Sequence, residues 1–227
     1  MILLRPSKKS VKSILILFVL WFIPWVFLLY TGILVYFPYH KDGKSRFIRI
    51  TGPVASWFGG DWASWKQIPN ACKRSLVIAE DDQFYHHHGI SIESIKESIE
   101  VNWRYKRILQ GGSTITQQLV KNAFLSRDKS YIRKIREIIG ALLADLTMSK
   151  DFQILWYLNI VEYGPKVYGI KAAARYYYHK DVRYLRTKEC VALITVLPSP
   201  IRLGNSIKRG SYSERFLRRY NRILPYF

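Results

Sequence analysis

Three kinds of residue are scarce in this chain of 227 residues: cysteine, acidic side chains and helix breakers. The two cysteines, Cys72 and Cys190, are too few and too far apart for the dense framework of a disulfide-rich scaffold. We interpret them as ordinary small buried residues and expect no disulfide framework. Nine Pro and thirteen Gly in a chain that is 49% hydrophobic exclude a disordered polypeptide and predict a folded core. The length suits one ordinary domain with accessory segments.

The shortage of acids gives the chain a strong positive charge. Sixteen acidic residues stand against 36 basic ones, for a formal net charge of +20. Residues 1–40 hold four of the basic residues and no acid, so +16 remains on the rest of the chain. A surplus of this size predicts an anionic partner, such as nucleic acid, acidic lipid or a phosphorylated substrate.

Charge is absent altogether from residues 14–37. As a helix this segment is about 36 Å long, enough to cross a hydrocarbon core of roughly 30 Å. Bulky residues follow it, so no signal-peptidase site is expected and the segment should remain as a single-pass anchor. The basic residues 1–13 before it predict a cytoplasmic tail, with the rest of the chain on the periplasmic or outer face of the cytoplasmic (inner) membrane.

Residues 38–66 form a membrane-proximal connecting segment rich in aromatic side chains. Trp57, Phe58, Trp62 and Trp65 suit a membrane interface, and an ordinary aromatic core explains them equally well. Beyond this segment the periodicity predicts a mostly α-helical part with no strand-rich region or internal repeat.

Helix starts are marked clearly. Asn70, Ser91, Ser113-Thr114 and Ser130 are the N-cap candidates. The helix after Ser91 carries Ile92, Ile95, Ile99 and Trp103 at helical spacing. The helix after Ser130 is predicted to be the longest, with a stripe typical of a buried helix, made by Ile132, Ile135, Ile139, Leu142 and Leu146.

Residues 76–89 combine an apolar run, three consecutive acids and an aromatic–histidine segment. Burying one carboxylate of Glu80, Asp81 and Asp82 there would raise its pKa, which prepares a general acid or base. The alternative is an acidic helix end that is capped at Gly89.

Two further patterns suggest an anion site. Thr114, Gln118 and Lys121 share one face of a helix that begins after a Gly-Gly turn, where they could grip phosphate oxygens or simply form a polar surface. Arg133 and Glu137 are four residues apart, with the base before the acid, the less favourable order for a helical ion pair. The two side chains could therefore face a common ligand.

Taken together, these motifs resemble glycosyltransferase family 51, and in particular its monofunctional biosynthetic peptidoglycan transglycosylases. The five motifs occur in family order over residues 68–200. They are carried by Glu80, Asp81, Phe84, His87 and Gly89; by Gly111, Ser113, Thr114, Ile115, Gln117, Gln118, Lys121 and Asn122; by Arg133, Lys134 and Glu137; by Tyr157, Leu158 and Asn159; and by Gly169, Ala172, Ala173 and Tyr177.

The resemblance implies a mainly α, lysozyme-like glycosyltransferase domain at residues 67–204, behind one transmembrane helix and followed by a basic tail at residues 205–227. It implies that Glu80 and Glu137 are catalytic, with Glu80 as the base that deprotonates a sugar hydroxyl. Lys121, Arg133 and Lys134 are expected to bind the substrate pyrophosphate. The remaining substrate-binding residues implied are Asp81, Phe84, His87, Ser113, Thr114, Gln117, Gln118, Asn122 and Asn159.

The implied reaction is inverting β-1,4 transfer between lipid II units, with release of undecaprenyl pyrophosphate. A divalent cation such as Mg²⁺ at Glu137 is expected, and no organic cofactor. Expected partners are lipid II, nascent glycan strands, the bilayer and proteins of cell-wall synthesis or division, but not nucleic acid. Leu155 replaces a glutamate that penicillin-binding members usually carry in the fourth motif. A lytic murein glycosidase and a non-catalytic cell-wall scaffold are the alternative functions.

Overall fold

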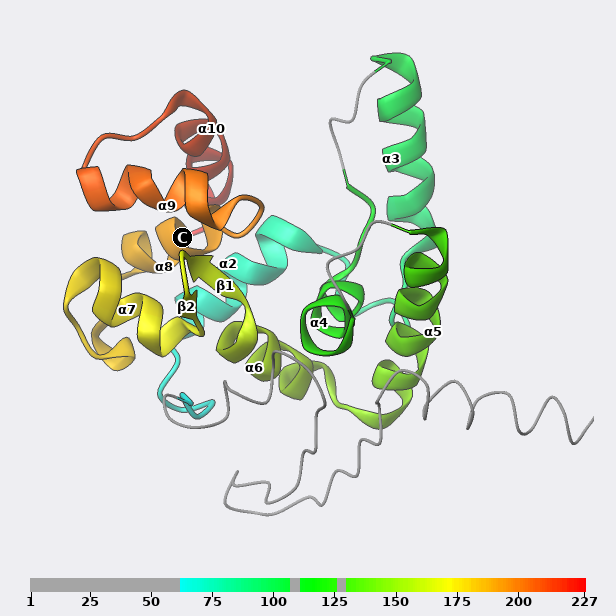
Figure 1. Cartoon of the computed structure of the whole chain (residues 1–227), viewed down its shortest axis with the longest axis horizontal. Helices are drawn as coiled ribbons and strands as arrows, with labels where there is room; N and C mark the ends of the chain where they lie inside the picture. Colours follow the sequence, from blue (N-terminus) through cyan, green and yellow to red (C-terminus); the bar gives the residue numbers. More distant parts are fainter. Residues whose placement is uncertain (1–61, 107–110, 126–129) are drawn as a thin grey trace, which may run out of the picture. The chain divides into compact units, whose positions relative to one another are not determined.

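The computed structural model describes residues 62–106, 111–125 and 130–227, which are mainly helical as predicted (Figure 1). All of them lie in one compact unit, Ser56–Phe227. The helices are α2 (Asn70–Glu80), α3 (Ile92–Arg104), α4 (Ile115–Phe124), α5 (Tyr131–Thr147), α6 (Lys150–Ile160), α7 (Ile170–Tyr178), α8 (Thr187–Thr195), α9 (Pro200–Arg209) and α10 (Glu214–Ile223). Strands β1 (Glu162–Gly164) and β2 (Val167–Tyr168) form a small antiparallel sheet, and two 3₁₀ turns lie at Val182–Tyr184 and Leu224–Tyr226.

Figure 1 shows two groups of helices, which contact each other through α4 and α6. Helices α3, α4 and α5 lie on one side of the unit, and α2 and α6 to α10 lie on the other. Helix α4 packs against both α5 and α6, and α2 packs most extensively against α8. The apolar core belongs mainly to the second group, because α6 and α8 bury residues on nearly all of their faces.

A disulfide joins Cys72 of α2 to Cys190 of α8. The expectation that both cysteines are buried is confirmed, but the interpretation of them as unlinked side chains is wrong. Their Cα atoms are 4.6 Å apart although 118 positions separate them in the chain. The pairing follows from the packing of α2 on α8, which no local sequence signal reports.

Three of the four predicted helix caps are confirmed. The side chains of Ser91, Thr114 and Ser130 accept hydrogen bonds from the backbone N–H three residues later, at 3.1, 3.2 and 3.1 Å. Helix α2 differs, because its N-cap is Pro69 and Asn70 is its first residue. The side chain of Asn70 instead accepts from Nζ of Lys73 at 3.1 Å.

Helix α5 is turned the opposite way from the prediction. Its apolar stripe is exposed rather than buried: Ile132 is 63% exposed and Leu146 is 83% exposed, and Ile135, Ile139 and Leu142 are also exposed. The residues that α5 buries are Glu137, Gly140 and Ala141. Gly140 lies so close to α4 that a Cβ there would be 2.7 Å from Cγ1 of Val120. The small and charged side of α5 therefore faces the protein.

The same arrangement holds in α3. Ile92, Ile99 and Trp103 are exposed, and Ser98 is the residue that the helix buries. Helices α3 and α5 thus share an unusual property, since each presents its apolar side chains to the outside. Periodicity identified these helices correctly but not the direction in which the stripes face.

The predicted transmembrane segment, residues 14–37, lies outside the described residues. No helix within the described ranges is long and apolar enough to cross a membrane. The connecting segment 38–66 is described only from Trp62, whose ring packs edge-on against that of Trp156 with centroids 5.0 Å apart. Nζ of Lys73 lies 3.9 Å from the ring centroid of Trp65. Both tryptophans are half-buried against the protein, and their contact with a membrane interface stays a prediction. Trp57 and Phe58 lie outside the described residues.

Residues 205–227 are not a separate solvated tail. They complete α9 and form α10, which buries Phe216 and Ile223. Near the chain end, Nη2 of Arg74 in α2 donates to the carbonyl oxygen of Tyr226 at 3.3 Å. The predicted basic tail therefore packs on the rest of the domain, where α10 lies against α8 and α2.

Candidate active site

Glu80 is the last residue of α2, and its carboxylate is held from two sides. Nε2 of Gln118 in α4 donates to Oε2 at 2.8 Å, and Nη2 of Arg219 in α10 donates to Oε1. Gln118 in turn accepts a hydrogen bond from the hydroxyl of Tyr157 at 2.9 Å. Burial raises the pKa of Tyr157 well above its ordinary value, so this hydroxyl stays a donor. The carboxylate plane of Glu80 is therefore fixed by three helices, α4, α6 and α10.

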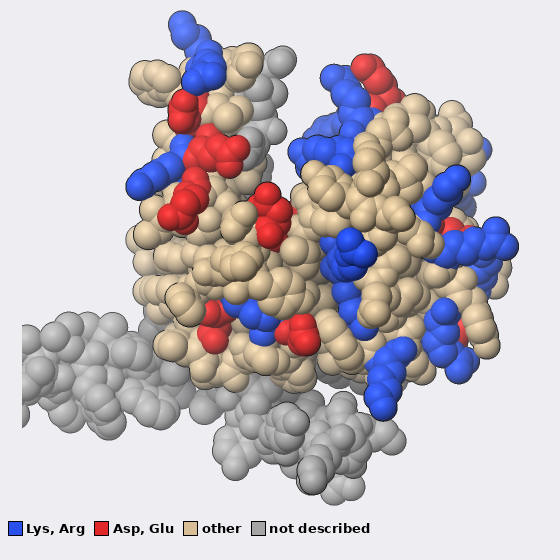
Figure 2. Space-filling model, turned by 180° about the vertical axis from the view of Figure 1, so that it is seen from behind, with Lys and Arg blue, Asp and Glu red and all other residues tan. Residues whose placement is uncertain are grey.

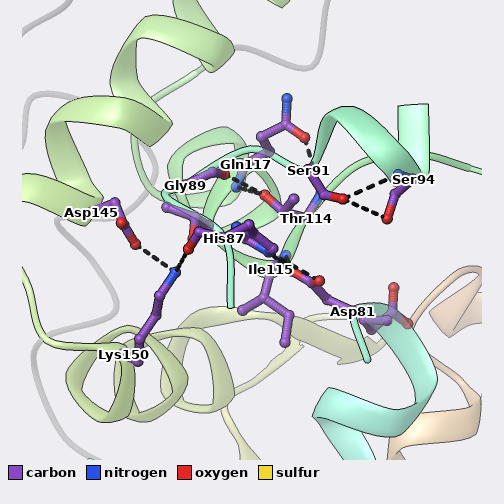
Figure 3. A network of polar contacts seen from close by, with 12 residues as sticks. Asp81, His87, Gly89, Ser91, Ser94, Thr114, Ile115, Gln117, Asp145 and Lys150 are labelled. Atoms are coloured by element: carbon purple, nitrogen blue, oxygen red, sulfur yellow. Dashed lines mark hydrogen bonds and ion pairs between the residues drawn. The ribbon is translucent and has the colours of Figure 1, made fainter. Parts of the chain in front are cut away.

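Asp81 is the buried carboxylate of the acidic run. It accepts from Nε2 of His87 at 2.9 Å and from the backbone N–H of Ile115 at 2.9 Å (Figure 3). Burial raises the pKa of Asp81, and these two hydrogen bonds offset only part of that effect. Asp81 thus ties the segment after α2 to the first turn of α4, next to the contact between Glu80 and Gln118.

Gly89 is where this segment passes over α5. It has a φ of +76°, and a Cβ there would lie 2.5 Å from the carbonyl oxygen of Ala141. Its own carbonyl oxygen accepts a hydrogen bond from the Thr114 hydroxyl at 2.6 Å. Helix α2 ends at Glu80, so the alternative of an acidic helix capped at Gly89 is wrong. The glycine is required by its positive φ and by the close approach of the two backbones.

Lys150, at the start of α6, contacts the segment between α2 and α3. Its Nζ donates to the carbonyl oxygen of His87 at 2.6 Å, pairs with Asp145 of α5 at 2.7 Å and lies over the ring of Phe84 (Figure 3). Burial opposes ionisation of Asp145, but hydrogen bonds from Lys150 and Gln153 outweigh it and lower its pKa. Phe84 is fully buried, so it acts in this structure as a core residue.

Thr114 and Gln117 form a capping box at the start of α4. The backbone N–H of Thr114 donates to Oε1 of Gln117 at 2.9 Å, and Thr114 accepts from the N–H of Gln117. Both side chains are buried and serve the helix start. Ser113, one residue earlier, accepts from Nζ of Lys134 at 3.0 Å, which links the start of α4 to the cationic residues of α5.

Glu137 lies on the buried face of α5, 2% exposed, between two cations. Nη1 of Arg133 donates to its Oε2 at 2.8 Å, and Nζ of Lys134 donates to its Oε1. Arg133 and Glu137 therefore contact each other directly, although their order in the helix is the less favourable one. The carboxylate holds the two cations side by side.

Lys121 is influenced electrostatically by both acidic centres. It lies on α4, open to solvent but largely surrounded by protein, and this partial burial lowers its pKa. Its ammonium is attracted by Glu137 and Glu80 and repelled by Arg133 and Lys134. Glu80 and Glu137, which are 57 positions apart in the sequence, are thus both within electrostatic reach of one lysine.

Of two further residues predicted to bind substrate, Asn159 contacts backbone groups of the protein, and Asn122 lies near Lys121. Asn159 is buried, and its Nδ2 donates to the carbonyl oxygens of Ala63 at 3.0 Å and Leu155 at 2.8 Å. It therefore connects α6 to the segment before α2. Asn122 lies half-buried on α4, one residue after Lys121. A substrate contact by either residue stays a prediction.

The donor set around Glu137 does not fit a resident metal ion. Both of its oxygens already accept from cations, which would repel a further positive charge. In the described ranges, no three His, Cys, Asp or Glu side chains gather as metal ligands would. Mg²⁺ also binds through substrate phosphates, so an ion that arrives with the substrate stays a prediction.

The surface is hollowed between the two groups of helices (Figure 2). Acidic side chains lie along α3 on one wall of this hollow, and Lys and Arg side chains gather over α9 and α10 on the other. The cations over α9 and α10 would attract an anionic ligand to the second wall, in addition to the Lys121, Arg133 and Lys134 cations of α4 and α5.

Three residues that hold the site escaped the sequence analysis as site residues: Arg219, Asp145 and Lys150. Tyr157 was noted within a motif but given no role. Arg219 was one of many basic residues in the predicted tail, so nothing in the sequence distinguished it. Asp145 and Lys150 flank the junction of α5 and α6, where each could have been an ordinary surface charge.

Comparison with known proteins supplies the family. The family model described as Transglycosylase matches residues 50–226. The chain is 40% identical over 139 residues to the biosynthetic peptidoglycan transglycosylase of Herminiimonas arsenicoxydans, a match over 61% of this chain and 60% of that protein. It is 35% identical over 163 residues to the protein of the same name from Acinetobacter baylyi, over 71% of this chain and 73% of that one. For the protein of that name from Burkholderia lata the identity is 37% over 182 residues, 76% of this chain and 73% of the relative.

The family match spans the helices that carry every residue of the site, from Glu80 on α2 to Arg219 on α10. The relatives share one name and 35–40% of the aligned residues with this chain. On this evidence, the chain belongs to the transglycosylase family, glycosyltransferase family 51.

Proposed function

We propose that the protein polymerises peptidoglycan glycan chains. It would join lipid II units by β-1,4 glycosyl transfer with inversion and release undecaprenyl pyrophosphate. The observation that carries this proposal is the position of α4: its Gln118 contacts Glu80, Ser113 just before it contacts Lys134 of the Arg133–Lys134–Glu137 cluster, and Lys121 lies one turn after Gln118. One site therefore holds a carboxylate that can take a proton and several cations that can hold an anion.

Glu80 takes the proton in this mechanism. The 4-hydroxyl of the acceptor sugar gives its proton to the Glu80 carboxylate while its oxygen attacks the anomeric carbon of the donor. The bond from that carbon to the pyrophosphate oxygen breaks, and the electron pair leaves with the pyrophosphate. Gln118 and Tyr157 support this step, because they fix the carboxylate in one orientation before the sugar arrives.

The cations of α4 and α5 act on the leaving group. A pyrophosphate is a weak base, so its departure needs compensation of charge more than it needs a proton. Lys121, Arg133 and Lys134 offer three positive charges to it. Glu137 holds the last two against their mutual repulsion. A hydrolytic enzyme that cuts finished murein expels no pyrophosphate and has no use for such a cluster.

The exposed stripes of α3 and α5 support action at a membrane. A soluble protein rarely leaves contiguous large apolar side chains on two neighbouring helices exposed. Lipid II keeps its chain in the bilayer, so the site must approach the membrane surface. An anchor at residues 14–37 and a domain outside the cytoplasmic membrane agree with this requirement.

The proposal is tested with the full chain in detergent micelles and purified lipid II. We expect polymer that muramidase digests, together with release of undecaprenyl pyrophosphate. Glu80→Gln should abolish polymerisation while leaving the fold intact. Lys121→Ala should lose far more activity than Lys106→Ala, which removes an exposed lysine near the end of α3.

The possible failures are distinct. Cleavage of finished murein without polymer formation would identify a lytic glycosidase instead. A silent Glu80→Gln would leave a non-catalytic scaffold as the explanation. Equal losses from Lys121→Ala and Lys106→Ala would replace the local pyrophosphate site by general attraction to an anionic surface.

A further inference from the structure

Arg219 differs from the other arginines of α10 in its surroundings. Its side chain is 19% exposed, whereas that of Arg218 is 74% exposed and pairs with Glu214 on the same helix. Nη2 of Arg219 donates to Oε1 of Glu80 and lies 3.4 Å from the carbonyl oxygen of Ala79. The guanidinium thus contacts both the carboxylate of Glu80 and the backbone just before it.

The sequence of α10 explains how Arg219 reaches this position. Phe216 and Ile223 are buried, and they lie three residues before and four residues after Arg219. Residues at this spacing share one face of a helix. Ser213 caps the helix by accepting from the N–H of Phe216 at 3.3 Å. Packing of this face against α2 and α8 therefore carries Arg219 to the end of α2.

Stability alone is a poor explanation for an arginine here. Burial lowers the pKa of Arg219, and Glu80 opposes that effect only partly. The buried Nε–H of Arg219 finds no acceptor among the residues that the structure describes. A buried charge with an unsatisfied donor costs free energy that a well-packed apolar side chain would not. We therefore expect Arg219 to have a function at this position.

We propose that Arg219 is a positioning residue for the catalytic base, an inference that rests on the proposed function of Glu80. Arg219 holds Oε1 and Gln118 holds Oε2, so rotation of the carboxylate is blocked from both sides. A carboxylate has about four lone-pair positions. These two contacts leave free positions on both oxygens, and the acceptor hydroxyl takes one of them. The C-terminal helix is then part of the active site rather than an appendage.

The first test compares Arg219→Ala with Arg218→Ala, its exposed neighbour on the same helix. We expect Arg219→Ala to lower kcat for lipid II by about 10- to 100-fold with KM changed less than about threefold, because a misplaced group costs rate rather than binding. Arg218→Ala should stay within about twofold of the parent chain. Arg219→Lys should recover part of the loss, since it keeps the charge but not the fork. Equal kcat values for Arg219→Ala and Arg218→Ala would overturn the inference.

A thermodynamic cycle gives a readout that does not need activity. Stability is measured for the parent chain, Glu80→Gln, Arg219→Ala and the double variant. If the two side chains interact as the structure indicates, Arg219→Ala should change stability differently in the Glu80→Gln background. Additive effects would contradict the contact. If Arg219→Ala does not fold, Arg219→Lys and Arg219→Gln carry both comparisons.

The failures of this inference and of the proposed function are separable. If the parent chain makes no polymer from lipid II, the proposed function fails, whatever the cycle shows. If the parent chain polymerises and Arg219→Ala behaves as Arg218→Ala does, the function stands and the positioning role is rejected.

Discussion

Helices α5 and α6 are neighbours in the chain, and both begin after a serine cap, yet they use their apolar residues in opposite ways. Helix α6 buries Ile154, Trp156, Leu158 and Ile160 in the core. Helix α5 exposes its isoleucines and leucines and buries Glu137 with two small residues. The contrast teaches that apolar residues at helical spacing do not by themselves identify a surface that faces the core of the same protein.

This difference indicates that one side of the domain provides stability and the other provides the cations of the site. The side built from α2, α6 and α8 contains the core and the disulfide, and it presents Glu80 at the end of α2. The side built from α3 and α5 has little core of its own and presents the cationic cluster. Stability should therefore depend mainly on the first side, and binding of the leaving group on the second.

Matched truncations on the two helices are the strongest way to break this comparison. Leu158→Ala removes a fully buried side chain of α6 and should lower the free energy of unfolding by about 2–5 kcal/mol, through lost burial and a cavity. Ile135→Ala on α5, where the side chain is 57% exposed, should cost under about 1 kcal/mol. Denaturant unfolding in detergent measures both. Equal costs would mean that the stripe of α5 is packed in a core after all.

The disulfide sharpens the same division. Replacing both Cys72 and Cys190 by Ala should lower the free energy of unfolding by about 2–4 kcal/mol, because the bond closes a long loop of the unfolded chain. A reductant should destabilise the parent chain but leave the double variant unchanged. Insensitivity of the parent chain to reductant would show that α2 and α8 are held by packing alone.

The cationic side makes a prediction about pH. Because the pKa of Lys121 is lowered from 10.5, its ammonium is lost at a lower pH than in an ordinary lysine. In the proposed mechanism the charged form neutralises the leaving group, so activity should fall as the pH rises through that lowered pKa. Lys121→Arg, which stays charged, should move the alkaline limb of the pH–rate profile to higher pH. Lys106→Arg is the control. If the alkaline limb of the pH–rate profile does not move in Lys121→Arg, Lys121 is not the group that neutralises the leaving group.

The smallest effect on stability is expected on the outer face of α5. Leu146→Cys, at a side chain that is 83% exposed, should change stability by less than about 0.5 kcal/mol. A nitroxide attached there should become accessible to lipid-soluble oxygen when the full chain is reconstituted in vesicles. Tyr184→Cys, an exposed position in the 3₁₀ turn before α8, should stay accessible to aqueous quenchers only. If aqueous quenchers reach the nitroxide at both positions, the apolar stripe of α5 does not contact the membrane.

Much of the site could be predicted because its signals are local. The serine and threonine caps at Ser91, Thr114 and Ser130 act on N–H groups three residues away, so a short window contains the whole interaction. The acids at Glu80 and Asp81 and the cations at Lys121 and Arg133 were named from motifs of a few residues. The motifs did not show which of these acids is deeply buried. In the structure it is Asp81, and burial raises its pKa.

The contacts that escaped prediction span long separations in the chain. Arg219 meets Glu80 across 139 positions, and the disulfide bridges 118. Neither partner has a distinctive neighbourhood in the sequence, since Arg219 is one of several arginines in α10. Such contacts depend on how α10 and α8 dock against α2, and docking is decided by the summed burial of many side chains.

The sequence by itself determined where α3, α4 and α5 begin, that the fold is mainly α, and which acids and cations are available for chemistry, because each of these depends on residues a few positions apart. Only the tertiary structure decided which face of α5 is buried, that Cys72 pairs with Cys190, and that an arginine near the chain end grips Glu80. Those outcomes depend on which surfaces meet when the helices pack, and helical periodicity says that a face is apolar without saying what covers it.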